Sequence, residues 1–435
     1  MFKKILPLNS IIFLRFFGIF LVLPLISVYA SSLESATPLL VGIVVGGYAL
    51  TQAILQVPFG VWSDRVGRKR VIVFGLVIFL IGSVISYFAT DIYTLIFGRL
   101  LQGAGAIGSV VSASVSDVTR EEERGKAMAI IGASIGMSFA LSMIFGSLLG
   151  GYFGVDFLFL ITALLTIIAL YMATKIQNGG KIEIIYPKRG TEVSIFSRKE
   201  ILYLFASSFL QKGVMAITFV IIPILLTGDF GWEKSELWKL YIPAMIIGLA
   251  TMPISIKVGE KGGNPKLVFL ISAFMFVIVA GILSFGNSEN LIITALLLFF
   301  PAFNLIEPLI QSMATKFVRA DEKGKVLGYT NSFAYFGTFF GGVGAGIFLS
   351  FGSVNELGMI LIVLSAIWFV WTLTIKNPIP KGNLYLKHSH FLQQKLERGD
   401  FEFVDEWYLN VSENLLVVKF DKKKWNEEDL LQKIK

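Results

Sequence analysis

Four ionisable residues lie inside long apolar stretches of this 435-residue sequence: Arg15, Arg99, Lys212 and Glu307. A charge at the centre of a bilayer costs about 2.5–3.5 kcal/mol on insertion scales, so such residues usually face a cavity or a partner and serve a function. Glu307 is the only acid deep inside an apolar stretch, and Asn304 precedes it by about one helical turn. A buried carboxyl group can bind and release a proton. We therefore expect these five residues to lie on a pathway for protons or substrate.

The three cations admit more than one role. Lys212 lies about 18 Å from the nearer end of its apolar stretch at about 1.5 Å per helical residue, which matches the depth of Glu307. The two could form an ion pair, and that pair could be structural or could carry protons. Arg99 would be either a partner in proton coupling or a cation that orients the substrate. Because Arg15, Arg99 and Lys212 outnumber Glu307, a carrier of small anions is an alternative.

A second group of charged residues lies in a short turn between two apolar stretches. Residues 60–70 read Gly-Val-Trp-Ser-Asp-Arg-Val-Gly-Arg-Lys-Arg. Gly60 and Gly67 permit a tight turn and a close approach of helices. Asp64, placed among Arg65, Arg68 and two further cations, can form an ion pair at the membrane edge or meet a helix N-terminus. The spacing indicates a conformational role.

The chain needs a membrane to position these residues. Hydrophobic residues make up 55% of it and charged residues 16%, which is too apolar for an ordinary soluble protein. A crossing takes about 20 apolar helical residues, and periodicity and length predict twelve helices. They cover residues 8–30, 39–62, 71–89, 92–116, 127–152, 157–174, 200–226, 237–256, 267–286, 290–318, 326–350 and 356–375. Twenty-two Lys and Arg residues lie on one side and two, Lys234 and Lys239, on the other, so the positive-inside rule places both termini in the cytoplasm.

The twelve helices divide into two similar halves. The polar segment 176–199 separates six helices in 1–175 from six in 200–376, and we interpret it as a cytoplasmic linker. The run Arg-Glu-Glu-Glu-Arg-Gly-Lys at 120–126 returns as Arg-Ala-Asp-Glu-Lys-Gly-Lys at 319–325, an offset of 199 residues. This is the pattern of an internal duplication. Transporters built from parallel repeats expose a central site alternately as their halves rock.

Residues 377–435 have the composition of a soluble domain. Their pattern predicts strands at 383–387, 401–409 and 415–420 and helices at 391–398 and 427–434. The predicted fold is therefore an all-α membrane protein of twelve transmembrane helices followed by a small cytoplasmic α+β domain of order β-α-β-β-α.

The remaining composition argues against other classes of protein. The net charge of +8 resides mainly in loops, so it indicates membrane topology and not nucleic-acid binding. The chain contains no cysteine, and His388 and His390 lie outside the apolar part. We expect no enzyme activity, no cofactor and no metal site. The expected partners are the lipid bilayer, protons and a small-molecule substrate. We expect a monomer, with self-association through the C-terminal domain as the alternative.

The turn at residues 60–70 resembles signature A of the major facilitator superfamily, and Arg-Leu-Leu-Gln-Gly-Ala-Gly at 99–105 resembles its signature B. In that family the acid and the arginine of the turn cluster with an acid at the end of helix 4 and hold the outward-open state. Carried over, the cluster would comprise Asp64, Arg68 and Asp117. The second half has a degraded copy of the turn, in which Asn264 stands where Arg68 does.

Further features resemble a narrower branch, the drug:proton antiporter-like members and, within them, the YajR-type transporters. These features are the runs at 13–18 and 116–121, the acid of helix 10 and the short α+β tail. The resemblance implies the twelve-helix major facilitator fold, proton-driven export and a ferredoxin-like C-terminal domain, which here would lack its last strand. Helix 5 has Gly146-Ser147 where the antiporter branch has a Gly-Pro pair.

The sequence thus predicts a secondary active transporter in a bacterial inner (plasma) membrane. We expect proton-coupled efflux of small hydrophobic or amphipathic molecules by alternating access. A symporter or uniporter for a small anionic solute is one alternative. A membrane sensor that presents the C-terminal domain is another, although a sensor needs neither the internal repeat nor the signature turn.

Overall fold

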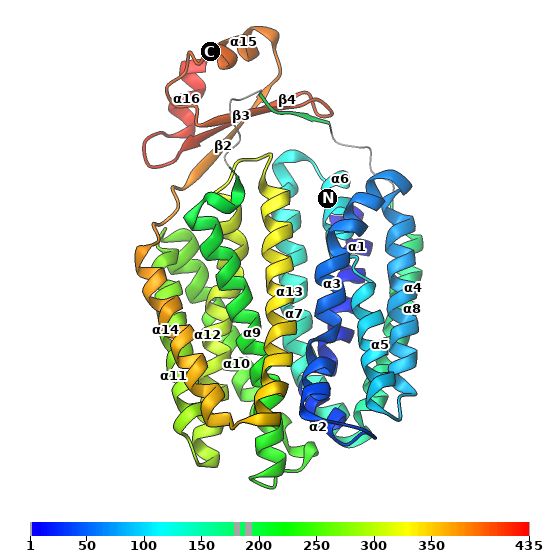
Figure 1. The fold of residues 1–435 in the computed structure, drawn as a ribbon. Helices are drawn as coiled ribbons and strands as arrows, with labels where there is room; N and C mark the ends of the chain where they lie inside the picture. Colours follow the sequence, from blue (N-terminus) through cyan, green and yellow to red (C-terminus); the bar gives the residue numbers. More distant parts are fainter. Residues whose placement is uncertain (1, 178–182, 188–193, 435) are drawn as a thin grey trace.

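The computed structural model describes residues 2–177, 183–187 and 194–434. Within them, twelve helical segments are long and apolar enough to cross a membrane, which confirms the predicted number. Figure 1 shows these helices as one bundle, with the C-terminal α+β domain at one end. We call this end, where the N-terminus also lies, the proximal end, and the opposite one the distal end.

The first half contains eight helices that make six crossings. They are α1 (Phe2–Leu21), α2 (Ile26–Ser31), α3 (Pro38–Val66), α4 (Arg68–Tyr87), α5 (Ile92–Ala104), α6 (Gly108–Val118), α7 (Glu121–Phe153) and α8 (Val155–Thr174). The fourth crossing is interrupted between α5 and α6. α7 begins at Glu121, earlier than the predicted residue 127, because acidic side chains in a first turn interact favourably with the helix dipole.

The second half also makes six crossings. The second of these, the eighth in chain order, ends in a π-helical stretch. The elements are α9 (Lys199–Gly228), η2 (Lys234–Glu236), α10 (Trp238–Ile254), η3 (Ser255–Lys261), α11 (Pro265–Phe285), α12 (Glu289–Lys316), α13 (Lys323–Phe351) and α14 (Val354–Thr374). Between the halves lie a two-residue strand, β1 (Ile184–Ile185), and a 3-10 turn, η1 (Ile195–Ser197).

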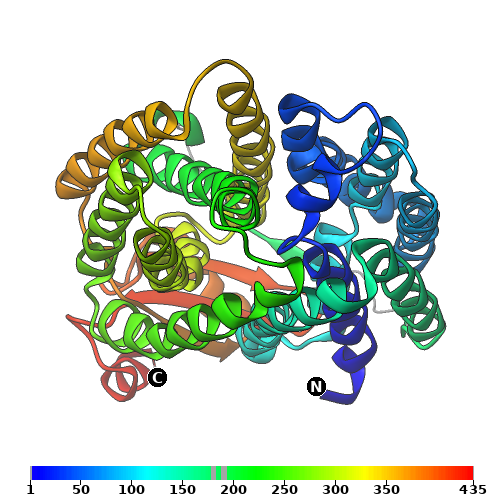
Figure 2. The ribbon, with the colours of Figure 1, turned by 90° about the horizontal axis from the view of Figure 1, so that it is seen from below.

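The two halves pack against each other at the distal end (Figure 2). The Ser27 hydroxyl of α2 donates to the Phe219 carbonyl of α9 at 3.0 Å, and the Tyr241 hydroxyl of α10 donates to the Pro24 carbonyl at 3.4 Å. One apolar core runs through both halves here, whereas the proximal part of the first half has a separate core, from Ile5 in α1 to Ile176 after α8. The close packing between the halves therefore belongs to the distal side.

The C-terminal domain contains a four-stranded antiparallel sheet. Its elements are β2 (Lys381–Lys387), α15 (His390–Arg398), β3 (Glu406–Asn410), β4 (Leu415–Asp421) and α16 (Glu427–Ile434). β4 lies between β2 and β3, which makes these two strands parallel to each other, as in a split β-α-β unit. The predicted β-α-β-β-α order is confirmed. In Figure 1 α15 and α16 lie on the side of the sheet that faces away from the bundle.

The fourth strand of the sheet comes from the segment between the halves. β1 pairs with β3, so that Ile184 lies opposite Asn410 and Ile185 opposite Leu409, and the strand order is β1-β3-β4-β2. This segment was expected to be a linker alone, and part of it lies outside the described residues. The domain obtains an edge strand from elsewhere in the chain, although not at the β2 edge, where a last ferredoxin-like strand would lie.

One predicted strand is wrong over its first part. Residues 401–405 form a turn, and the strand begins only at Glu406. The Phe401 and Phe403 rings contact each other, and the Phe403 ring lies 6.1 Å from that of Trp425. The alternating apolar pattern there reflects a turn that packs into the domain core.

Candidate functional site

Lys212 and Glu307 form an ion pair between α9 and α12. The Lys212 Nζ atom lies 2.9 Å from both carboxylate oxygens of Glu307. The exposed fractions of the two side chains are 21% and 34%, although both residues lie deep within apolar helices. The pair is therefore partly accessible, although the halves pack against each other on the distal side.

An aromatic ring lies against this pair and stacks in turn on a ring of the first half. The Lys212 Nζ atom lies 4.4 Å from the centroid of the Phe303 ring, a distance typical of a cation–π contact. Phe303 stacks at 5.7 Å on Phe139 of α7, which belongs to the first half. Asn304 is not part of this cluster, because its amide donates to the Phe300 carbonyl one turn earlier.

Arg15 of α1 is completely buried, and its hydrogen bonds extend through Gln52 to the second half. Its Nη2 atom donates to Gln52 of α3 at 3.2 Å, and Gln52 donates to the hydroxyl of Tyr335 on α13 at 2.7 Å. Uncharged side chains thus connect Arg15 of the first half with Tyr335 of the second half.

Arg99 of α5 is also completely buried. It donates to the Val44 carbonyl at 3.3 Å and to Gln102 at 2.7 Å, and its guanidinium lies 4.6 Å from the centroid of the Tyr48 ring. Within the described residues neither Arg99 nor Arg15 pairs with a carboxylate, and each retains N–H groups without an acceptor: Nε and Nη1 of Arg15 and Nη2 of Arg99. Both are unbalanced positive charges in the apolar interior.

Sequence reasoning missed the side chains that lie around the two arginines, namely Gln52, Tyr335 and Tyr48. None of the three is charged, so none stood out by the cost of burying it. A glutamine in the middle of an apolar helix was nevertheless an available signal, since an amide side chain also needs hydrogen-bond partners there.

The predicted charge cluster in the 60–70 turn is formed at the proximal end. Arg68 Nε lies 2.9 Å from an Asp117 oxygen, and Arg68 Nη2 lies 2.6 Å from an Asp64 oxygen. Gly67 has φ of +104°, a region that glycine tolerates far better than other residues, where α3 ends and α4 begins. Arg65 is exposed. All members of the cluster belong to the first half, so the cluster does not itself join the halves.

The second half has a counterpart with rearranged charges. Lys316 of α12 stands at the repeat position of Asp117, 199 residues later, and pairs at 2.7 Å with Glu260 of η3. Asn264 accepts hydrogen bonds from the Leu267 amide and from Asn377, at the start of the C-terminal segment. An acid–lysine pair replaces the arginine-centred cluster. Gly60, the remaining predicted residue of the turn, leaves room for Ser109 of α6.

Comparisons with known proteins agree with this geometry. The family model described as "Major Facilitator Superfamily" matches residues 8–342. The inner membrane transport protein YajR of Escherichia coli strain K12 is 32% identical over 98% of this chain and 96% of its own length. Multidrug resistance protein 2 of Bacillus subtilis strain 168 is 24% identical over 84% of this chain and 94% of its own length.

A solved structure supports the fold. The crystal structure of a D-xylose–proton symporter superimposes with a TM-score of 0.68 at 14% identity, covering 87% of this chain and 99% of the symporter. At that identity the likeness concerns the arrangement of helices alone.

Proposed function

Because this chain belongs to the Major Facilitator Superfamily of membrane transporters, we propose that it exports small hydrophobic or amphipathic molecules in exchange for protons. The similar multidrug resistance protein and inner membrane transport protein favour export and an inner (plasma) membrane location. We place the proximal end, with both termini and the domain at 377–435, in the cytoplasm, since the Lys and Arg residues of the loops concentrate there. The segment 176–199 is then the cytoplasmic linker between the halves 1–175 and 200–376.

The Lys212–Glu307 ion pair carries this proposal. With the bundle open towards the proximal side, Glu307 is paired and ready for a substrate to enter. After the halves rock, a proton from the distal side binds the Glu307 carboxylate and the ion pair is lost. Reopening to the proximal side releases the proton, and Lys212 pairs again. A proton entering the cell contributes about 2.3 kcal/mol per 100 mV of membrane potential.

The two arginines favour a second candidate, transport of a small anionic solute. Arg15 and Arg99 are buried without carboxylate partners in the described structure. A bound carboxylate or phosphate group would supply the missing acceptors and balance the charge. In that case Lys212 and Glu307 neutralise each other and the arginines select the solute.

One experiment distinguishes these functions. Purified protein in liposomes receives an imposed pH gradient and a panel of cationic, neutral and anionic compounds, while internal pH is recorded. We expect substrate-dependent proton movement in the wild type, and none with Glu307→Gln, which cannot ionise. Glu200→Gln, which changes an acid in the first turn of α9, is the matched control and should behave as wild type.

Proton movement that persists with Glu307→Gln would contradict the coupling role of Glu307. Selective uptake of anions that is lost in Arg99→Gln but retained in Glu307→Gln would favour the second candidate.

A further inference from the structure

The C-terminal sheet presents a polar surface to the bundle. Along β3, Trp407 and Leu409 enter the domain core, whereas Glu406, Tyr408 and Asn410 point to the opposite face, as the two-residue period of a strand requires. These three side chains are buried although they lie outside the domain core. We call this side of the sheet the docking face.

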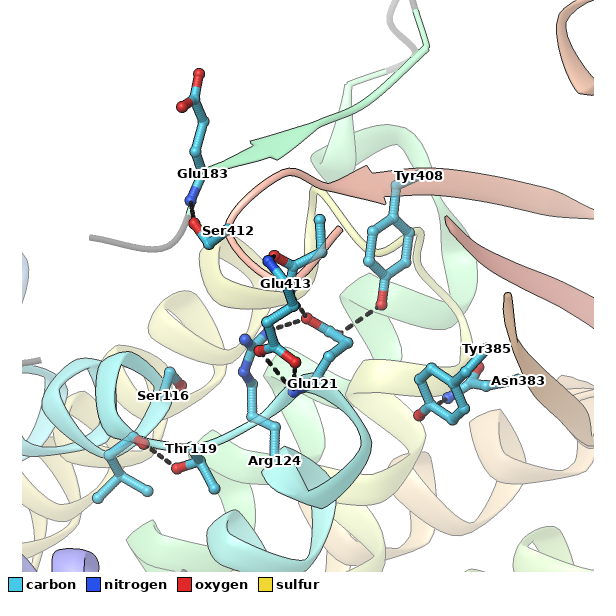
Figure 3. A network of polar contacts seen from close by, with 12 residues as sticks. Ser116, Thr119, Glu121, Arg124, Glu183, Asn383, Tyr385, Tyr408, Ser412 and Glu413 are labelled. Carbon is cyan, nitrogen blue, oxygen red and sulfur yellow. Dashed lines mark hydrogen bonds and ion pairs between the residues drawn. The ribbon is translucent and has the colours of Figure 1, made fainter. Parts of the chain in front are cut away.

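The docking face binds the first turn of α7, in the first half (Figure 3). The Tyr408 hydroxyl and the Asn410 amide donate to the two carboxylate oxygens of Glu121 at 2.8 and 3.0 Å. The backbone N–H of Glu121 in turn donates to the carboxylate of Glu413 at 2.9 Å. Burial, together with the charge of Glu121, raises the pKa of Tyr408, so its hydroxyl keeps its proton. Glu121 is held from both its side chain and its backbone.

The same face binds the segment that precedes α13, in the second half. The backbone N–H of Ala320 donates to the Glu406 carboxylate at 2.9 Å. The other oxygen of Glu406 pairs at 2.7 Å with Lys419, and the side chains of this pair are 7% and 4% exposed. Lys419 thus fixes the carboxylate that reaches the second half.

The two attachment points are equivalent in the internal repeat. Glu121 and Ala320 are separated by the repeat offset of 199 residues, and each offers its backbone N–H to a glutamate of the domain. The N–H group of Glu121, at the start of α7, lacks a partner within the helix and lies where negative charge is favoured, whereas that of Ala320 lies in the turn before α13. One sheet therefore binds matching points of the two halves.

The linker between the halves strengthens this attachment. The Glu183 backbone N–H donates to Ser412, and the Val411 N–H donates to the Glu183 carbonyl, both at 2.9 Å. The Tyr186 ring lies 5.6 Å from that of Tyr408. The segment that joins the halves is thus part of the sheet that spans them.

We propose that the C-terminal domain is a brace that holds the proximal ends of the two halves apart and must release one half before they close. Rocking of repeat-built halves changes the separation of the starts of α7 and α13. The sheet is too stiff to change its dimensions with this separation. Closure therefore breaks either the contact of Glu413 with the Glu121 N–H or the contact of Glu406 with the Ala320 N–H. The brace therefore favours the arrangement that is open on the proximal side.

The distance between the two helix starts tests this proposal directly. The chain has no cysteine, so Gly125→Cys and Gly324→Cys introduce the only two sites for spin labels. These equivalent glycines are exposed, and a side chain at either one meets no atom within 4 Å. Double electron–electron resonance on the full-length protein in lipid nanodiscs then reports the separation. The readout needs neither a substrate nor a proton gradient, so it does not depend on the proposed function.

Each end of the brace is weakened separately. Glu413→Ala with Tyr408→Phe removes contacts to the first half. Glu406→Leu with Lys419→Met removes the acceptor for Ala320, and replacing a buried ion pair by apolar side chains is often neutral for folding. Glu402→Ala, an exposed acid of the same domain, is the control. Hydrogen exchange in β4 reports whether the domain stays folded.

We expect one dominant distance in the wild type and the control. Either double change should add a shorter distance, with the closed population rising about tenfold, the effect of losing one hydrogen bond to a charged group. Unchanged distances in both folded variants would overturn the brace. A response in only one of them would also overturn it, because the domain would then be attached to one half without restraining its distance from the other. If one variant loses hydrogen-exchange protection in β4, its domain has unfolded and no longer binds the two halves. The distance must then shorten in that variant as well.

Discussion

Lys212 and Glu307 balance each other, whereas Arg15 and Arg99 have no carboxylate partner in the described part of the chain. A paired charge in a membrane protein is sensitive to the loss of its partner, since the remaining charge stays in an apolar setting. The arginines are instead held by amide and carbonyl acceptors and by aromatic rings. The two kinds of charge should therefore respond differently to substitution.

We predict that Lys212→Met lowers the thermal stability of the detergent-solubilised protein and that Glu307→Gln, added to it, restores most of the loss. Breaking a buried ion pair costs about 3–5 kcal/mol, and partial exposure of this pair should bring the cost below that range. Melting curves from tryptophan fluorescence measure the change. Lys239→Met is the matched control, because Lys239 pairs with Glu236 at the surface. A double variant as unstable as the sum of both single changes would contradict the prediction.

The depth of each charge predicted the Lys212–Glu307 pairing, because two residues at one depth in neighbouring helices have few other places to find a partner. Depth does not specify which side of its helix a residue faces. For this reason Asn304, one turn from Glu307, was placed with it, whereas its amide bonds within its own helix. The Gln52–Tyr335 connection lies between halves and depends on packing that no local pattern encodes.

At the scale of elements, Arg68 ties the start of α4 to the end of α6 through Asp117 and to the end of α3 through Asp64. The Asp117 side chain is 20% exposed and that of Asp64 is 56% exposed. A more exposed ion pair is weakened more by water and salt. Asp117 should therefore be the stronger anchor.

We predict that Asp64→Asn lowers transport by at most about fivefold while the protein still folds in the membrane, since exposed ion pairs contribute up to about 1 kcal/mol. Asp117→Asn should lower it further. Transport in liposomes, normalised to the amount of inserted protein, gives the comparison. Arg70→Gln, an exposed residue of the same turn, should leave the rate unchanged. Equal effects of Asp64→Asn and Asp117→Asn would contradict the stronger role of Asp117, and a loss as large with Arg70→Gln would show that the effect is not specific to the cluster.

Element boundaries show what sequence periodicity can and cannot predict. The apolar cores of the crossings were predicted, but the charged first turn of α7 was assigned to a loop, because helix capping extends a helix beyond its apolar part. β1 was not predicted at all. Its two residues carry too little pattern to identify a strand, and its partner β3 lies more than 220 residues later.

At the scale of the molecule, the duplicated sequence predicted two similar halves, and the structure contains them. It did not predict which side is closed, because that depends on contacts between halves. α3 and α13 approach backbone to backbone near the distal end: a Cβ atom on Gly342 would lie 2.7 Å from the Gly42 carbonyl oxygen. The distal glycines and the proximal brace thus favour the same arrangement.

We predict that Gly342→Ala opens the distal side and brings the proximal ends together. The added methyl group meets backbone atoms of α3, which cannot move aside without separating the two helices. The labels at positions 125 and 324 should then report a larger share of the short distance. Gly344→Ala lies on the same helix, where nothing is within 4 Å of an added Cβ, and it gains the same helix propensity of about 1 kcal/mol. It should leave the distances unchanged. If both variants behave alike, the glycines act through helix stability and not through contact between the halves. If only Gly342→Ala responds, we expect its combination with Glu413→Ala and Tyr408→Phe to shift the distances further. The distal helix contact and the proximal domain contact are separate, and each stabilises the same arrangement.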